Sequence, residues 1–168
     1  MYSLAIARTG LLDHEARSGE FDPLTAATEA NDHKAYYPGA VPLHILMSGD
    51  RATGRLLGAQ ILGLRKAEIS KRIDIIAAAL FQNAFVEDLN DMDLSYTPPF
   101  SSPWDPVQMA AQTWVAVARD AVRNSCIEHA AQMRMKLRGS TDGDLCFLIT
   151  TVRLSEPGSL DNPWRAIR

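Results

Sequence analysis

The chain has 168 residues, of which 46% are hydrophobic and 22% are charged, so its length and composition suit a globular protein with a core of its own. Its formal net charge of −3 predicts no general attraction to nucleic acid or to an anionic membrane surface. Its apolar runs are too short to cross a bilayer, and its first residues lack the basic start and the long apolar stretch of a signal peptide.

The first part of the chain is predicted to contain short extended segments. Residues 3–8 are partly apolar and end at Thr9-Gly10, a pattern that predicts a strand followed by a turn. Residues 13–17 predict one or two helical turns with Asp13 as the N-cap. Residues 21–32 are compatible with either a strand or a helix, and we predict an extended segment there.

An antiparallel hairpin is predicted next, after a turn at Pro38-Gly39. Residues 41–47 and 55–62 have the composition of strands, and the residues between them are turn formers. A link this short permits only antiparallel pairing. Gly58 inside the second strand predicts a bulge or the close approach of another backbone.

The first long helix is predicted from an apolar stripe at helical spacing. The stripe consists of Ile69, Ile73, Ile76, Ala77, Leu80, Phe81 and Ala84. We expect this helix to cover one face of the sheet and to expose Lys71, Arg72 and Asp74. The two basic residues could instead contact a phosphate of a nucleotide-bearing substrate. A short helical turn follows at residues 86–89. Strands and helices that run in blocks, without repeated βαβ units, favour an α+β fold in which helices cover an antiparallel sheet.

A stiff aromatic segment occupies the middle of the chain. Four prolines lie within residues 98–106, and each fixes φ and removes a backbone donor, so this segment is neither a helix nor a central strand. It carries Tyr96, Phe100 and Trp104, and it ends at a predicted helix start with Asp105 as the cap. Such a segment costs little entropy to order, which suits docking on a partner surface. The alternative is a connector whose aromatic rings pack on their own domain.

The last third is predicted to be mainly helical. Its predicted parts are a helix at 107–137 interrupted at Asn124-Ser125, a turn at 140–144, a strand at 145–154 and a tail at 155–168. The two cysteines, Cys126 and Cys146, form no CxxC pair, and we expect buried thiols in a reduced, cytoplasmic setting.

Several motifs in the first two thirds of the chain occur in the same order as in a known protein family. They are Tyr36-Tyr37-Pro38-Gly39-Ala40, Gly54-Arg55-Leu56-Leu57-Gly58-Ala59-Gln60, Lys71-Arg72-Ile73-Asp74, Asp93-Leu94-Ser95-Tyr96-Thr97-Pro98-Pro99-Phe100-Ser101 and Trp104-Asp105-Pro106. With them, the chain resembles the C-terminal dimerisation domain of the FAD-dependent pyridine nucleotide-disulfide oxidoreductases, in the coenzyme A-disulfide reductase and NADH oxidase-like branch. The resemblance covers residues 1–112, the predicted dimerisation domain. Residues 113–168 would form a C-terminal extension packed on it.

The resemblance implies an antiparallel sheet with helices, a homodimer, and a domain that completes the active site of the partner subunit. Tyr36 and Tyr96 match positions at which tyrosines of this branch approach the flavin and the redox cysteine of the other subunit. Tyr37 replaces Tyr36 if the alignment shifts by one residue. FAD and NAD(P)H would be bound by upstream domains of the parent enzyme and not by this chain alone. The electron acceptor stays open between a coenzyme A disulfide, oxygen and another sulfur compound.

A phenol suits this implied role. It is protonated at neutral pH, so it can donate a hydrogen bond to a thiolate or help to pass a proton. The alternative for each tyrosine is that its ring packs and its hydroxyl bonds to the backbone. For the whole chain, the alternative is a free-standing protein-interaction module with the same fold and no redox activity.

Other parts of the family pattern are absent from the sequence. No GxGxxG motif follows a strand, and no cysteine lies within the region of resemblance. His14 and His33 have no second ligand at metal-binding spacing, so we predict surface histidines and no metal site. No Ser/His/Asp arrangement supports a small enzyme with a site of its own. The chain is therefore expected to be either a fragment of a longer enzyme or a separately encoded module.

Overall fold

The computed structural model describes residues 3–138. The chain divides into two compact units, Met1–Ala121 and Val122–Arg168. Our domain boundary after residue 112 remains a prediction. The predicted turn at 140–144, strand at 145–154 and tail at 155–168, together with Cys146, lie outside the described residues.

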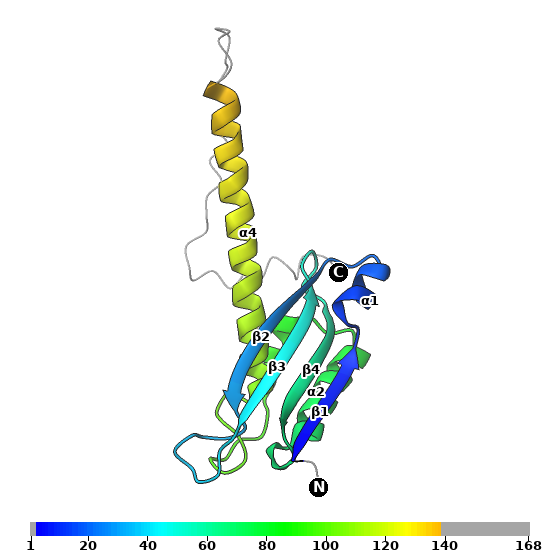
Figure 1. The fold of residues 1–168 in the computed structure, drawn as a ribbon, viewed down its shortest axis with the longest axis vertical. Helices are drawn as coiled ribbons and strands as arrows, with labels where there is room; N and C mark the ends of the chain where they lie inside the picture. The colour runs from blue at the N-terminus through cyan, green and yellow to red at the C-terminus, as the bar shows by residue number, and fades with distance from the viewer. Residues whose placement is uncertain (1–2, 139–168) are drawn as a thin grey trace. The chain divides into compact units, whose positions relative to one another are not determined.

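The first unit is built on a four-stranded antiparallel sheet in the order β1-β4-β3-β2 (Figure 1). Its strands are β1 (Leu4–Gly10), β2 (Pro23–Asn31), β3 (Pro42–Asp50) and β4 (Leu56–Leu64). The predicted hairpin is confirmed as β3 and β4, in which Ile45 lies opposite Ile61. The extended segment predicted at residues 21–32 is confirmed as β2. The α+β fold class predicted from the sequence is therefore confirmed.

Helix α2 (Ile69–Phe81) covers one face of this sheet, behind β1 and β4 in Figure 1. Ile69, Ile73 and Ile76 are buried in the core that the sheet and the helix share, as their spacing predicted. Phe81 was predicted to belong to the same stripe, and this is wrong, because its side chain is 83% exposed. It is the last residue of α2, and the buried part of the stripe ends at Ala79.

Two short helices flank α2. The 3₁₀ helix η1 (Arg65–Ala67) precedes it, and α3 (Val86–Asn90), at the predicted short helical turn, follows it. Helix α1 (Asp13–Ser18) follows β1, but its predicted cap is wrong. Leu12 occupies the N-cap position, and its backbone N–H donates to Glu15 Oε2 at 2.7 Å. The Asp13 carboxylate instead accepts a hydrogen bond from Thr25 Oγ1 at 2.5 Å.

Helix α4 (Pro106–Arg138) begins at the predicted residue. In the first unit its buried residues are Val107, Ala110, Ala111, Trp114 and Ala118, which join the core of the sheet. Trp114 Nε1 donates a hydrogen bond to the carbonyl oxygen of Leu24 at 2.7 Å, which fixes this part of α4 to β2. In the part of the chain that is described, no helix has the length and apolarity needed to cross a membrane.

Two predictions for α4 are wrong. The helix continues through Asn124 and Ser125, because each of these residues costs a helix less than about 1 kcal/mol relative to alanine. Cys126 is exposed and not buried. Its neighbours Val122 and Ile127 are exposed as well, so no core forms around the thiol among the described residues.

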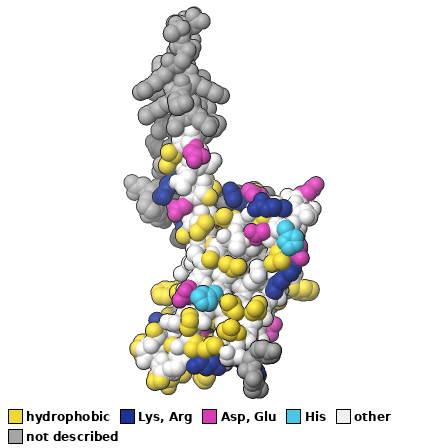
Figure 2. Space-filling view, viewed as in Figure 1, with side chains coloured by type: hydrophobic (Ala, Val, Ile, Leu, Met, Phe, Trp, Pro, Cys, Tyr) yellow, Lys and Arg dark blue, Asp and Glu magenta, His cyan; other side chains and the backbone are white. Residues whose placement is uncertain are grey.

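Much of the other face of the sheet is open within residues 3–138, although α1 lies over the part where Asp13 Oδ1 accepts hydrogen bonds from Thr25 Oγ1 and Ser48 Oγ. Figure 2 shows hydrophobic side chains gathered on this face. Ile6 of β1 lies opposite Leu62 of β4, and both are exposed together with Leu4 and Leu46. This face is a surface to which other polypeptide can bind.

Gly58 should tolerate no side chain. The predicted close approach is confirmed, because a Cβ there would lie 2.4 Å from the carbonyl oxygen of Leu11. We expect Gly58→Ala to lower the free energy of unfolding by about 1–3 kcal/mol in urea titrations, since the backbone of Leu11 must move. Gly19→Ala is the matched control, because its Cβ would meet nothing closer than 3.5 Å. Equal stability of the two variants would contradict this account.

Candidate functional site

The candidate site lies where two irregular segments meet. The Tyr36 loop (residues 32–41) connects β2 to β3, and the Tyr96 arm (residues 91–105) connects α3 to α4. The arm contains no helix or strand, as its prolines predicted. Tyr36 is 74% exposed and Tyr96 is 41% exposed. The structure thus places both predicted site residues on accessible segments.

The phenols of Tyr36 and Tyr96 are neighbours. Loss of water around the Tyr96 phenol raises its pKa above the ordinary value, and the Coulombic and hydrogen-bond interactions with Tyr36 raise it further. The raised pKa keeps the proton on the Tyr96 phenol, which has one hydrogen bond to donate. The arrangement places two phenol hydroxyl groups beside each other on accessible segments.

Tyr37 has a different environment from Tyr36. Its ring packs edge-on against His33, with the ring centroids 6.1 Å apart and the planes at 77°. This contact lies within the Tyr36 loop, so the ring of Tyr37 packs on its own domain, which is the alternative to a role at a partner's active site. The environment favours Tyr36 over Tyr37 as the residue that can approach a partner.

The other aromatic residues of the Tyr96 arm are exposed. Phe100 and Trp104 each have more than half of their surface accessible. Their rings do not join the core of the first unit, so a connector whose aromatic rings pack on their own domain is not what the described residues form. An exposed, stiff aromatic segment is instead suited to binding another surface.

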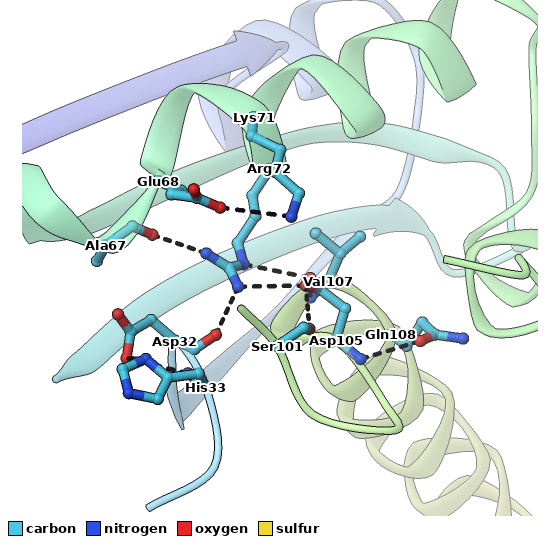
Figure 3. Close-up of polar contacts among 10 residues, drawn as sticks. All are labelled: Asp32, His33, Ala67, Glu68, Lys71, Arg72, Ser101, Asp105, Val107 and Gln108. Carbon is cyan, nitrogen blue, oxygen red and sulfur yellow. Dashed lines mark hydrogen bonds and ion pairs between the residues drawn. The ribbon is translucent and has the colours of Figure 1, made fainter. Parts of the chain in front are cut away.

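Arg72 of α2 links the two segments, because its guanidinium lies between Asp32 of the Tyr36 loop and Asp105 of the Tyr96 arm (Figure 3). Its side chain is 1% exposed, so our prediction that it faces solvent is wrong. Nη1 donates to the carbonyl oxygen of Ala67 at 2.7 Å, and Nη2 donates to the carbonyl oxygen of Asp32 at 2.6 Å. The sequence held a signal for this placement, because Arg72 lies three residues after Ile69 and four before Ile76, on the buried stripe.

Both carboxylate oxygens of Asp105 bind the guanidinium of Arg72. Arg72 Nε lies 3.3 Å from Oδ1, and Nη2 lies 3.2 Å from Oδ2. The same carboxylate accepts a hydrogen bond from Ser101 Oγ at 2.8 Å and caps α4 by accepting one from the backbone N–H of Val107 at 3.0 Å. The cap at Asp105 was predicted from the sequence, whereas its buried ion pair was not.

His33 is buried, which corrects our prediction of a surface histidine. The Asp32 carboxylate holds it in place, because Oδ1 accepts from the backbone N–H of His33 and lies 3.0 Å from His33 Nδ1. Oδ1 also accepts from the backbone N–H of Val41 at 2.9 Å, across the base of the Tyr36 loop. His33 Nε2 has no hydrogen-bond partner among the described residues. His14, by contrast, is exposed, as predicted.

Two small cavities lie in the first unit. One of about 210 Å³ lies between the Tyr36 loop, η1 and the Tyr96 arm, and its lining includes His33, Lys66 and Phe100. A second, of about 280 Å³, is lined by residues that include Gly10, Leu57 and Leu80. Both fall below the usual range for sites that hold a drug-sized ligand, so neither has room for a dinucleotide. The described residues contain no group of three or more side chains suited to hold a metal ion.

Comparison with known proteins gives a consistent set of similarities. Residues 1–106 match the family model described as the dimerisation domain of pyridine nucleotide-disulphide oxidoreductases. A CoA-dependent NAD(P)H sulfur oxidoreductase from Pyrococcus abyssi is 40% identical over 107 residues, which cover 64% of this chain and 23% of that protein. A coenzyme A disulfide reductase from Staphylococcus epidermidis is 31% identical over 108 residues, which cover 64% of this chain and 24% of that protein.

Solved structures are similar over the same region. The structure of reduced CoADR-RHD from Bacillus anthracis aligns with a TM-score of 0.63 at 35% identity, over 70% of this chain and 21% of that one. A water-forming NADH oxidase from Lactobacillus brevis aligns with a TM-score of 0.68 over 73% of this chain and 27% of that one, but at 22% identity this likeness concerns the fold alone. The chain spans about a quarter of the length of the curated relatives it matches.

Arg72 and its neighbour Lys71 should differ sharply on substitution. Arg72→Ala leaves the Asp105 carboxylate buried without its cation, which typically costs about 3–5 kcal/mol of stability. Lys71 forms an exposed pair with Glu68 at 3.4 Å, so Lys71→Ala should cost less than about 1 kcal/mol. Urea unfolding followed by circular dichroism measures both. A similar loss of stability in the two variants would show that the buried pair has no special weight.

Proposed function

Since this chain belongs to the dimerisation-domain family of the pyridine nucleotide-disulphide oxidoreductases, we propose that it is the homodimerisation domain of a flavin-dependent reductase and completes the active site of the partner subunit. The observation that carries this proposal is the pair of neighbouring phenols, Tyr36 and Tyr96, on two exposed and well-anchored segments. On this proposal, the domain contributes to redox chemistry by lending side chains to a site held elsewhere.

The proposed substrate is a sulfur compound linked to coenzyme A. Relatives at 40% and 31% identity are a CoA-dependent sulfur oxidoreductase and a coenzyme A disulfide reductase. The similarity to a water-forming NADH oxidase extends to the fold only, so it lends less support to oxygen as the electron acceptor. The chemistry of the phenols agrees with a sulfur substrate, because a protonated phenol can donate a hydrogen bond to a thiolate.

The role proposed for the two tyrosines is to orient a sulfur atom and to hold a proton. A thiolate that leaves a disulfide or a persulfide carries negative charge, and a hydroxyl that already points at it stabilises that charge. The raised pKa of Tyr96 keeps its proton on the phenol oxygen until an acceptor arrives. Electron transfer in such an enzyme depends on FAD and NAD(P)H, which we propose are held by other domains.

Two surfaces are proposed as contacts in the complete enzyme. The exposed aromatic residues of the Tyr96 arm and the Tyr36 loop would face the second subunit of the homodimer. The uncovered apolar face of the sheet would pack on the upstream domains that bind FAD and NAD(P)H, because an apolar face of this kind is seldom left open to water. A reductase of this type also fits a reduced, cytoplasmic setting.

The alternative of a free-standing interaction module without redox activity has no specific support. The relatives described above are named as oxidoreductases or reductases. We therefore keep the reductase as the proposed function.

The chain should form a dimer through the Tyr96 arm. Light scattering after size-exclusion chromatography should give twice the 18.5 kDa mass of one chain, from an interface that buries more than about 1,000 Å². Trp104→Asp should shift the mass towards the monomer, because a charge replaces an exposed ring of the arm. Leu46→Asp, on the uncovered face of the sheet, is the control and should stay dimeric. A monomeric wild-type chain would count against the proposal.

Tyr96→Phe in the complete flavoenzyme should lower turnover of a coenzyme A-linked disulfide by about 10- to 100-fold, since positioned proton donors often contribute that much or more. The dimer mass should not change, because the ring remains. Tyr37→Phe removes a hydroxyl from the ring that packs on His33, and its turnover should stay near the wild-type value. Unchanged turnover in Tyr96→Phe would make Tyr96 a packing residue.

A further inference from the structure

We infer that Arg72 is a positioning residue that holds the Tyr36 loop and the Tyr96 arm in a fixed relation, so that their two phenols reach one acceptor together. Arg72 acts on the phenols indirectly, through the backbone and side chains that it binds. The inference rests on the function proposed for Tyr36 and Tyr96, and it assigns the residue that keeps them paired.

The first contact of Arg72 fixes the base of the Tyr36 loop. Its Nη2 donates to the carbonyl oxygen of Asp32, the first residue of the loop. The loop closes there, because the N–H of Asp32 donates to the carbonyl oxygen of Val41 at 3.0 Å, and the N–H of Val41 donates to Asp32 Oδ1 at 2.9 Å. Tyr36 follows only four residues after this anchored point.

The second contact of Arg72 fixes the Tyr96 arm. Asp105 binds the guanidinium through both oxygens and accepts a hydrogen bond from Ser101 Oγ. Ser101 is fully buried, and its backbone N–H donates to the carbonyl oxygen of Thr97 at 3.1 Å. Thr97 directly follows Tyr96, so a chain of contacts connects Arg72 to the residue next to the second phenol.

The geometry of these contacts requires a guanidinium. Arg72 meets carbonyl oxygens on the Tyr36 loop and on η1 and a carboxylate on the Tyr96 arm, which lie in different directions around one planar group (Figure 3). A lysine ammonium at this position keeps the charge but cannot span these partners as a fork. Arg72→Lys therefore separates the positioning role from the presence of a buried positive charge.

The phenol pair provides a direct readout of position. The pKa of Tyr96 is raised partly by the neighbouring Tyr36 phenol, so it reports whether the two segments keep their relation. A residue that only stabilised the fold would change the midpoint of unfolding and leave this pKa unchanged in the folded protein. A positioning residue changes both.

The test is an NMR titration of the full chain with ¹³C-labelled tyrosine. In Arg72→Lys, shown to be folded by circular dichroism, the pKa of Tyr96 should fall towards its ordinary value, in the same direction as in Tyr36→Phe. The matched control is Arg51→Lys, because Arg51 is an exposed arginine paired with Asp22 and lies at the other end of β3. A Tyr96 pKa equal to that of the wild type in Arg72→Lys would overturn the inference.

A second variant keeps the test decisive if Arg72→Lys does not fold. Ser101→Ala cuts the link between Asp105 and the turn after Tyr96 and leaves the ion pair intact. It should lower the pKa of Tyr96 in the same direction, by less than Tyr36→Phe does. A Tyr96 pKa unchanged from the wild type would overturn the inference.

Turnover of the complete flavoenzyme separates this inference from the proposed function. If Tyr96→Phe lowers turnover while Arg72→Lys changes neither turnover nor the Tyr96 pKa, the proposed function stands and the positioning role of Arg72 fails. If Arg72→Lys shifts the Tyr96 pKa while neither substitution alters turnover, Arg72 positions the phenols and the proposed function of the phenols fails. If the positioning role of Arg72 and the proposed function of the phenols are both right, Arg72→Lys lowers turnover at least a few-fold while the dimer mass stays constant.

Discussion

The buried ion pair between Arg72 and Asp105 is the interaction on which the arrangement of the site depends. Removing two charges from water costs several kcal/mol per ion, and that cost is offset only when further hydrogen bonds satisfy both groups. Here each partner has such bonds: Arg72 donates to the carbonyl oxygens of Ala67 and Asp32, and Asp105 accepts from Ser101 and Val107. The pair therefore joins the start of α2, the Tyr36 loop, the Tyr96 arm and the start of α4 at one point. A hydrophobic pair of similar volume could fill this space, but it could not fix two loop backbones.

Rigidity of the two exposed segments follows from that point. Asp32, the first residue of the Tyr36 loop, and Asp105, the last residue of the Tyr96 arm, both bind Arg72. The prolines of the Tyr96 arm also restrict the backbone of the arm itself. Exposed aromatic side chains on a rigid backbone lose little conformational entropy when they bind, whereas the same side chains on a mobile loop would lose more. The exposure of Tyr36, Phe100 and Trp104 is unfavourable in water, and the partner surface that we propose would cover them.

The sequence predicted those features that depend on neighbouring residues. Strand composition and turn residues predicted the β3–β4 hairpin, and the spacing of Ile69, Ile73 and Ile76 predicted the covering helix. The prolines predicted the irregular arm, and Asp105 was recognised as a cap. The errors concern residues whose environment is set by distant segments. Arg72 and His33 were assigned to the surface because their type is usually exposed, yet Asp105 and Asp32 compensate their burial. Asn124 and Ser125 were taken as a break although their helix propensities are only moderately low.

The candidate site, too, depends on contacts between segments that are distant in the sequence. No spacing rule relates Tyr36 to Tyr96, and the resemblance to the reductase family was needed to select them from the sequence. The structure adds a physical link between the two segments, because Arg72 binds Asp32 at the start of the Tyr36 loop and Asp105 at the end of the Tyr96 arm. Our inference is that this link sets the relation of the two phenols. On the proposed function, this chain affects catalysis through where its side chains are held. Changes in the buried network should then alter turnover of the complete enzyme, and the tolerance of the site to substitution should follow burial more closely than closeness to the phenols.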